Sequence, residues 1–201
     1  MLHADARFGE AVRERVAVLE QKTDAEVVVV AAERSGSYRD VAMTIGGIAA
    51  LVAFSVLLAI PWTVHPVLAV ADLALVMALV TWLVDGRTFV VRLASRTRRA
   101  EQVRLAAAAE FHLEAVHATP RRTGLLIYVS AAEARIELVP DVGVEARIPR
   151  ARWVEATGQL SATDLDLFLR GLDGVGAILA EHLPPAGERG VELSDAPRIR
   201  A

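Results

Sequence analysis

Most of the chain spaces its hydrophobic residues regularly, but two long stretches are hydrophobic almost throughout. In residues 5–21, apolar side chains recur at helical spacing among charged ones, which predicts an amphipathic helix. These apolar residues are Phe8, Val12, Val16 and Leu19. Residues 26–32 form a run of mainly β-branched residues that is too short for a helix. Such a run predicts a strand buried on both faces of a sheet.

The two hydrophobic stretches, residues 41–60 and 67–84, have the length of transmembrane helices. The first has 20 residues, which as a helix span roughly 30 Å, about the thickness of the hydrocarbon core. The second has 18 residues and one charge, Asp72. Residues 61–66 join them with a proline at each end and include Trp62, a residue that favours the membrane interface. We therefore expect a transmembrane hairpin, since a domain of this size is too small to cover two such helices in a soluble core.

The distribution of arginine predicts the orientation of this hairpin. Arg34 and Arg39 precede the first span, many arginines follow the second, and residues 61–66 contain neither Lys nor Arg. Because positive charge marks the cytoplasmic side, we expect both termini in the cytoplasm and the hairpin in the inner (cytoplasmic) membrane. Residues 1–15 are charged throughout and lack the apolar region of a secretory signal.

Regular spacing returns after the hairpin. Residues 96–117 predict an alanine-rich helix, and residues 124–130 predict a second strand buried on both faces. Residues 135–139 alternate polar and apolar side chains, and their short link to the preceding strand predicts a β-hairpin. Pro149 then opens a short helix that carries Trp153.

The last predicted helix has the clearest apolar stripe in the chain. It begins after a capping-box-like Ser161-Ala162-Thr163-Asp164 and ends before Pro184-Pro185. Its stripe consists of Leu165, Phe168, Leu172, Val175, Leu179 and Leu183. Residues 186–201 are predicted to be a polar tail.

This order of elements predicts an α/β fold. Helices in the crossover should place the first two strands in parallel and cover both faces of the sheet. We expect a three-layer α/β/α sandwich with a small mixed sheet, interrupted by a two-helix transmembrane hairpin. Residues 1–40 and 85–185 would form the two parts of one domain, with the hairpin at residues 41–84.

Composition excludes several classes of function. The chain is 54% hydrophobic, and the excess lies mostly in the two spans. Its net charge is −3, so the molecule lacks the basic surface of a nucleic-acid-binding protein. It contains no cysteine, which excludes disulfides and thiolate chemistry.

Three motifs resemble the TPM domain family. They are Leu19-Glu20-x-x-Thr23-x-Ala25-Glu26-Val27-Val28-Val29-Val30, Arg122-Thr123-Gly124-Leu125-Leu126-Ile127-x-Val129-Ser130-x-x-Glu133, and Ile136-Glu137-Leu138-Val139-x-Asp141-x-Gly143-Val144. The resemblance covers nearly all of the sequence outside the hairpin, and the inserted hairpin is similar to a membrane-bound bacterial branch of the family. It implies a similar sandwich fold.

The resemblance implies two kinds of activity. Some TPM relatives are described as phosphatase-like, and others resemble accessory factors of membrane complexes. This chain has Asp141-Val142-Gly143 where many relatives carry a Gly-x-Gly turn, and residues 188–193 lack an expected Asn. Both departures count against transferring a phosphate or metal site.

Two sets of polar residues are candidates for chemistry. Glu33, Ser130, Glu133 and Asp141 lie at predicted strand ends or turns. Together they would bind a divalent cation and a phosphate, or they are turn residues that accept backbone hydrogen bonds. If the third strand is antiparallel, Asp141 lies at the opposite edge of the sheet. Glu110, Glu114 and His117 have metal-ligand spacing on a helix, or form a solvated helix face.

Two further features concern the membrane. Arg96, Arg98, Arg99 and Arg104 form a basic cluster that would bind anionic lipid headgroups or act only as a topological signal. Asp72 is either tolerated within the second span or takes part in assembly or transport.

These observations leave two hypotheses for function. The leading one is a non-enzymatic accessory or interaction module for a membrane complex, whose partners are the bilayer and another membrane protein or a second copy. The alternative is a metal-assisted phosphatase-like hydrolase. No cofactor is required by the sequence, although a divalent cation would suit the second hypothesis.

Overall fold

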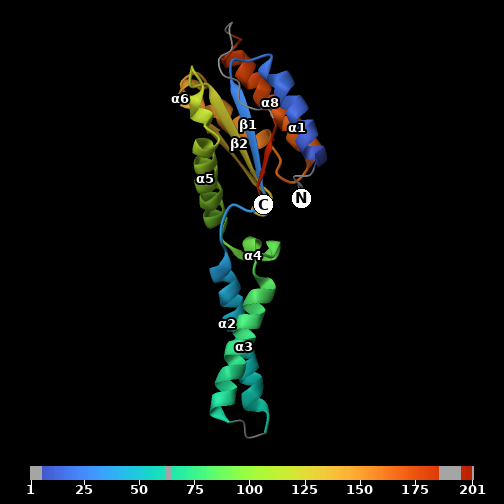
Figure 1. Cartoon of the computed structure of the whole chain (residues 1–201), viewed down its shortest axis with the longest axis vertical. Helices are drawn as coiled ribbons and strands as arrows, with labels where there is room; N and C mark the ends of the chain where they lie inside the picture. Colours follow the sequence, from blue (N-terminus) through green and yellow to red (C-terminus); the bar gives the residue numbers. More distant parts are fainter. Residues whose placement is uncertain (1–5, 62–64, 186–195, 201) are drawn as a thin grey trace. The chain divides into compact units, whose positions relative to one another are not determined.

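The computed structural model describes residues 6–61, 65–185 and 196–200. The chain forms two compact units (Figure 1). One is an α/β unit built from Met1–Ser35 and Ala100–Ala201, and the other is a helical unit, Gly36–Arg99. Trp62 and most of the predicted polar tail lie outside the described residues.

The α/β unit has a four-stranded sheet within the described residues, in the order β3-β2-β1-β4. The strands are β1 (Glu26–Ala32), β2 (Gly124–Ser130), β3 (Arg135–Pro140) and β4 (Arg198–Arg200). β1 and β2 are parallel along their full length, and β3 returns antiparallel to β2. The predicted mixed sheet is therefore confirmed, and β4 adds a strand that the sequence pattern did not predict.

Helices cover both faces of the sheet, which makes the three-layer sandwich (Figure 1). α1 (Ala6–Glu20) and α8 (Leu165–His182) pack on one face, with α7 (Arg150–Gln159) beside α8 and β3. α5 (Arg96–Leu113) packs on the other face. The short helices η1 (Val116–Ala118) and α6 (Val142–Glu145) lie in the connections before β2 and after β3.

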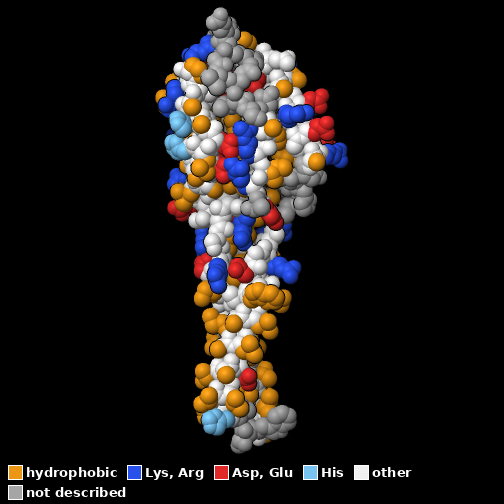
Figure 2. All heavy atoms as spheres, viewed as in Figure 1, with side chains coloured by type: hydrophobic (Ala, Val, Ile, Leu, Met, Phe, Trp, Pro, Cys, Tyr) orange, Lys and Arg blue, Asp and Glu red, His pale blue; other side chains and the backbone are white. Residues whose placement is uncertain are grey.

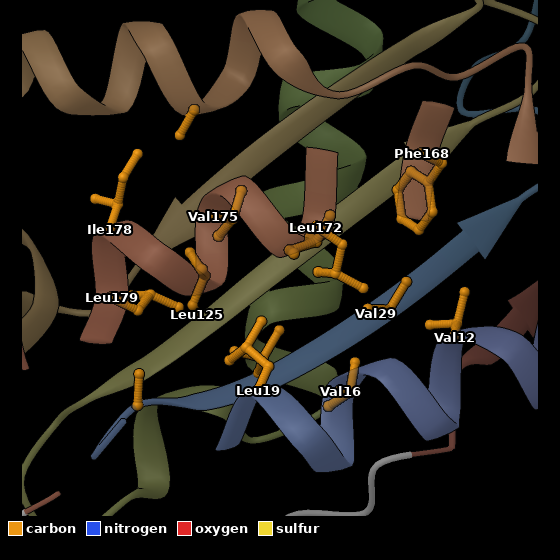
Figure 3. Packing of buried hydrophobic residues seen from close by; sticks show 14 of the residues in the cluster. Val12, Val16, Leu19, Val29, Leu125, Phe168, Leu172, Val175, Ile178 and Leu179 are labelled. Carbon is orange, nitrogen blue, oxygen red and sulfur yellow. The ribbon is translucent and has the colours of Figure 1, made fainter. Parts of the chain in front are cut away.

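The alternation of side chains along β1 and β2 explains why both strands are mainly apolar. Val27 and Val29 of β1 and Leu125 of β2 join the core beneath α1 and α8. The residues between them, such as Val28 and Leu126, join the core beneath α5. Figure 3 shows the first of these cores, where the apolar faces of α1 and α8 meet the sheet.

Helix α8 forms as its sequence predicts. The side chain of Asp164 accepts a hydrogen bond of 2.9 Å from the backbone N–H of Leu167, which satisfies one of the free donors at the helix start. The predicted stripe is buried at Phe168, Leu172 and Val175.

Helix α5 is shorter than predicted. It ends at Leu113, and Ala115 follows in a left-handed conformation with φ of 52°. His117 therefore lies in η1 and is not on the face of α5 that carries Glu110 and Glu114. The prediction of one helix over residues 96–117 is therefore wrong. The alanine-rich sequence favours helix and contains no signal for the break at Ala115.

The helical unit is a hairpin of two long helices followed by a short one. These are α2 (Arg39–Ala59), α3 (Pro66–Val84) and α4 (Thr88–Leu93), and the first two match the predicted spans to within about two residues. Proline opens α3, where a missing N–H costs nothing, and the His65 side chain accepts a hydrogen bond from the N–H of Val67.

α2 and α3 pack closely at one glycine. A Cβ atom built on Gly46 would stand 2.3 Å from Thr81 Oγ1 and 2.7 Å from the carbonyl oxygen of Met77. The adjacent Gly47 has nothing within 4 Å, so it faces away from α3. The small residue at position 46 therefore sets how closely the two helices approach.

The hairpin leaves almost all of its apolar surface exposed. α2 buries Ala42 and Gly46, and α3 has no buried residue along its length. Leu58 is 71% exposed and Trp82 76%. Figure 2 shows hydrophobic side chains over most of the visible face of the hairpin. By length and composition, both helices are able to cross a membrane.

Candidate functional site

A chain of hydroxyl groups ends at a buried carboxylate where β1 and β2 finish. Ser130 closes β2 and donates a hydrogen bond to the Glu133 carboxylate in the following turn. Ser35 Oγ donates to Ser130 Oγ at 2.7 Å and also contacts the Tyr128 hydroxyl at 3.1 Å. Because the proton of Ser35 is used toward Ser130, the Tyr128 hydroxyl is the donor to Ser35. All these hydrogen bonds run in one direction, toward Glu133.

Glu133 also holds the backbone that leaves β1. Its two carboxylate oxygens lie 3.2 and 3.3 Å from the N–H of Ser35, and its side chain is 1% exposed. The ladder between the strands continues past their ends, because Ala132 N–H donates to the Glu33 carbonyl at 2.9 Å. The β2–β3 turn is thereby attached to the segment that leads from β1 to α2.

This arrangement is suited to anchoring a loop and poorly suited to catalysis. Ser130 is fully buried, and its hydroxyl is already a donor to Glu133 and an acceptor from Ser35. A nucleophile must reach its substrate, and a general base must reach the proton that it abstracts. Neither Ser130 nor Glu133 meets this condition in the described structure.

Burial raises the pKa of Tyr128 above its ordinary value of 10, and the nearby charges of Glu110 and Glu133 act in the same direction, while the charge of Arg200 opposes them. An acid with a raised pKa in the folded state stabilises the fold below its unfolded pKa, and this contribution is lost as pH rises through the folded pKa. We therefore expect the free energy of unfolding to decrease as the pH rises above 10. Tyr128→Phe should remove the part of this decrease that comes from ionisation of Tyr128.

A direct titration checks this expectation. The chain has only two tyrosines, Tyr38 and Tyr128, so Tyr38→Phe leaves one tyrosinate signal in the ultraviolet spectrum. The expectation fails if that signal appears at or below pH 10 in the folded protein.

The four candidate strand-end residues do not converge. Ser130 and Glu133 lie together, but Asp141 lies at the other end of β2, where its N–H donates to the Gly124 carbonyl at 2.8 Å. Six residue steps along β2 correspond to about 20 Å. Glu33 is exposed, and it contributes its backbone to the site. The four residues therefore do not form the shared metal or phosphate site that the sequence offered as a candidate.

Asp141 has a structural role of its own. Its carboxylate accepts two hydrogen bonds from Arg122, at 2.7 and 2.8 Å, and one of 2.8 Å from the N–H of Val142 at the start of α6. The hydrogen bond with Asp141 raises the pKa of Arg122 above its ordinary value. Asp141 is thus a helix cap with a cationic partner.

In the second candidate set, the two glutamates form ion pairs with β4, a strand that the sequence pattern did not predict. Glu110 and Glu114 bind Arg198 and Arg200 of β4. His117 packs against Phe111 and His112, with ring centroids 6.2 and 5.3 Å away. Among the described residues, no group of three or more His, Asp or Glu side chains is arranged to hold a metal ion.

The basic cluster is divided between different environments. Arg98 forms a two-pronged ion pair with Asp40, with one contact of 2.8 Å, and lies over the Tyr38 ring. Arg96 and Arg104 are exposed, and Asp72 is exposed on α3. The contacts with Asp40 and Tyr38 fix Arg98 at the start of α2.

Residues that carry the family resemblance maintain the fold. The Glu20 carboxylate accepts a 2.7 Å hydrogen bond from the N–H of Val27, and the Thr23 hydroxyl donates to the Leu183 carbonyl at the same distance. A Cβ atom on Gly124 would stand 2.2 Å from the Val116 carbonyl oxygen. These motif positions are explained by packing and backbone hydrogen bonds without a ligand.

Sequence reasoning missed three participants in these sites. Ser35 and Tyr128 gave no signal because their hydroxyls join Ser130 only after β1 and β2 pair. The third is β4. Its arginines, Arg198 and Arg200, are two residues apart, and this spacing was the only indication of a strand, since alternate residues of a strand share a face.

Comparison with known proteins gives a fold and no function. No family model and no curated protein matches the chain. Among solved structures, the chain is similar to the BA42 protein of the psychrophilic bacterium Bizionia argentinensis, determined by NMR. The two share 13% sequence identity with a TM-score of 0.55, over 97% of this chain and 94% of BA42. At this identity the similarity supports the α/β fold alone.

Proposed function

We propose that the chain is a membrane-anchored interaction module, in which α2 and α3 cross the cytoplasmic membrane and the α/β unit serves a membrane complex from the cytoplasmic side. The observation that carries this proposal is the exposed apolar surface of the hairpin. Soluble monomers rarely expose continuous apolar surface of this extent, so it indicates contact with lipid or protein.

The residues around the hairpin support this placement. The Arg98–Asp40 pair stands at the start of α2, on the predicted cytoplasmic side. α4 exposes Phe89 and Leu93 beside Arg87 and Arg92. Apolar side chains next to arginines fit the boundary between acyl chains and anionic headgroups.

Asp72 supports contact with another membrane protein. A carboxylate within the bilayer costs up to about 2.5–3.5 kcal/mol on insertion scales, and pairing with a polar group of a neighbouring helix offsets that cost. Asp72 is exposed on α3, so such a group would have to come from outside the described hairpin. The resemblance to the TPM family, some of whose members are similar to accessory factors, agrees with this role.

The hydrolase alternative receives less support. Ser130 and Glu133 are buried, and Asp141 lies at the other end of β2. A divalent cation remains an expectation that belongs to this alternative.

Labelling of single cysteines tests the proposed topology, because the natural chain has none. In intact spheroplasts, a membrane-impermeant maleimide should label His65→Cys in the loop between α2 and α3. It should label Ser161→Cys in the α/β unit only after the membrane is opened. Labelling of Ser161→Cys in intact spheroplasts, or recovery of the chain in the soluble fraction, would refute the proposal.

An affinity-tagged form of the full chain tests the interaction. Purification in mild detergent should recover a reproducible partner, and Asp72→Leu should reduce its recovery. Leu75→Ala, a change at another exposed position of α3, is the matched control. Recovery of no reproducible partner would count against the interaction module even if the topology is correct.

A further inference from the structure

The last described residues complete the sheet from the far end of the chain. Arg198–Arg200 form β4, parallel to β1, with Arg198 opposite Val30 and Arg200 opposite Ala32. The Arg200 carbonyl accepts a 3.0 Å hydrogen bond from the N–H of Glu33. In Figure 1, β4 is the red strand beside the blue β1. Without β4, the outer edge of β1 would present unpaired backbone donors and acceptors.

The side chains of β4 match two carboxylates at the end of α5, Glu110 in its last turn and Glu114 directly after it. Arg198 Nε lies 2.6 Å from Glu114, and Arg200 contacts both Glu110, at 3.1 Å, and Glu114. Glu110 and Glu114 are one helical turn apart, so they face the strand together. Residues two apart on a strand point to the same face, which directs both arginines at this carboxylate pair. Ile199 is 49% exposed.

The two carboxylates require a cationic partner. Their side chains are only 14% and 13% exposed, and burying a carboxylate without a partner is unfavourable. The edge of β1 sets a second requirement, which is that its backbone groups pair with an extended segment, because unpaired strand edges bind other strands. Any occupant must therefore be an extended segment with cationic side chains at alternate positions.

The present occupant is held by few contacts. β4 has three residues and pairs with one neighbour, β1. Separating a short edge strand from its sheet costs less free energy than separating a strand in the interior of the sheet. A competing segment with the same pattern can therefore take its place.

We propose that the β1 edge together with Glu110 and Glu114 is a binding site for an extended segment of a partner protein with arginine at alternate positions, and that residues 196–200 occupy this site until the partner displaces them. Binding would replace β4 with a strand of the partner, with backbone hydrogen bonds supplying affinity and the carboxylates supplying specificity. The proposal goes beyond the interaction module above and does not depend on membrane insertion, since all its residues belong to the α/β unit.

A peptide-binding experiment on the full chain tests the proposal. The probe is a fluorescent peptide with the sequence of residues 196–200, Ala-Pro-Arg-Ile-Arg. Arg198→Ala with Arg200→Ala should open the site, because the tethered strand competes at a high effective concentration. We expect the peptide to bind this variant at least about tenfold more tightly than the wild-type chain, as measured by fluorescence anisotropy. Arg200→Ala alone is a milder variant that should shift affinity in the same direction.

Matched controls identify the site. Glu110→Gln with Glu114→Gln, placed on the opened variant, should abolish binding, whereas Glu101→Gln at an exposed position of α5 should not. A peptide with both arginines replaced by glutamate should not bind. Circular dichroism confirms that each variant is folded.

Three results would overturn the proposal. The first is the absence of peptide binding to the folded, opened variants. The second is equal binding when Glu110 and Glu114 are glutamine. The third is a wild-type dimer that the arginine substitutions dissociate, because the occupant would then be a second copy of this chain. Each can occur while the labelling pattern of the hairpin remains as proposed.

Discussion

Replacing Glu133 with leucine should lower the free energy of unfolding by about 2–4 kcal/mol, because the buried Ser130 hydroxyl and the partly buried Ser35 N–H lose their acceptor. Glu133→Gln keeps the shape and one acceptor oxygen but removes the charge, so we expect a smaller loss of about 1–2 kcal/mol. Urea unfolding of the full chain in mild detergent, followed by pulse proteolysis, measures both.

The control for Glu133 is Glu33→Gln, which changes an exposed carboxylate close to the same strand ends. It should leave stability within about 0.5 kcal/mol of the wild type. Glu133→Leu should also make the segment after Ser35 more sensitive to protease, because its anchor is gone. A Glu133→Leu chain as stable as the control would show that the hydroxyl chain does not hold the loop.

Gly46→Val should separate α2 from α3. The new Cβ would lie 2.7 Å from the Met77 carbonyl oxygen, which belongs to the backbone and cannot rotate away. Overpacking of this kind costs about 1–3 kcal/mol in well-packed interiors. We expect the midpoint of hairpin unfolding, measured by titration with sodium dodecyl sulfate in mixed micelles, to fall accordingly.

Gly47→Val is a closely matched control, because it makes the same substitution one residue along the same helix, where nothing lies within 4 Å. It shares the helix-propensity effect of Gly46→Val but should leave the packing intact. Thr81→Ala should partly rescue Gly46→Ala, since it removes the Oγ1 atom at 2.3 Å. Equal effects of the two valine substitutions would mean that α2 and α3 do not pack through Gly46.

The sequence pattern predicts those parts of the fold that depend on local periodicity. The apolar runs Val27–Val30 and Leu125–Ile127 predict buried strands. In the structure, alternate residues of both strands enter two different cores, so every position is apolar. The stripe of α8 and the two long hydrophobic helices are also local signals. The parallel pairing followed from the helices between the strands, because a crossover of that length leads to a parallel neighbour.

Features that depend on distant partners were not predictable. Residues 198–200 are too short to read as a strand, and their partner in β1 lies more than 160 positions earlier. Glu110 and Glu114 were candidate metal ligands together with His117, but in the structure they form ion pairs with Arg198 and Arg200. The break at Ala115 is a single left-handed residue within a sequence that favours helix on both sides.

The pairing of β1 with β2 has a consequence for synthesis of the chain. Glu26 pairs with Gly124, which lies 98 positions later (124 minus 26), so the whole hairpin comes between the two edges that must meet. At translation rates of about 5–20 residues per second, β1 leaves the ribosome about 5–20 seconds before its neighbour exists. During that interval the apolar strand β1 has no neighbour with which to pair. If α2 and α3 insert into the membrane as proposed, β2 can pair with β1 only when both ends of the hairpin lie on the same side, so formation of the sheet would report on insertion.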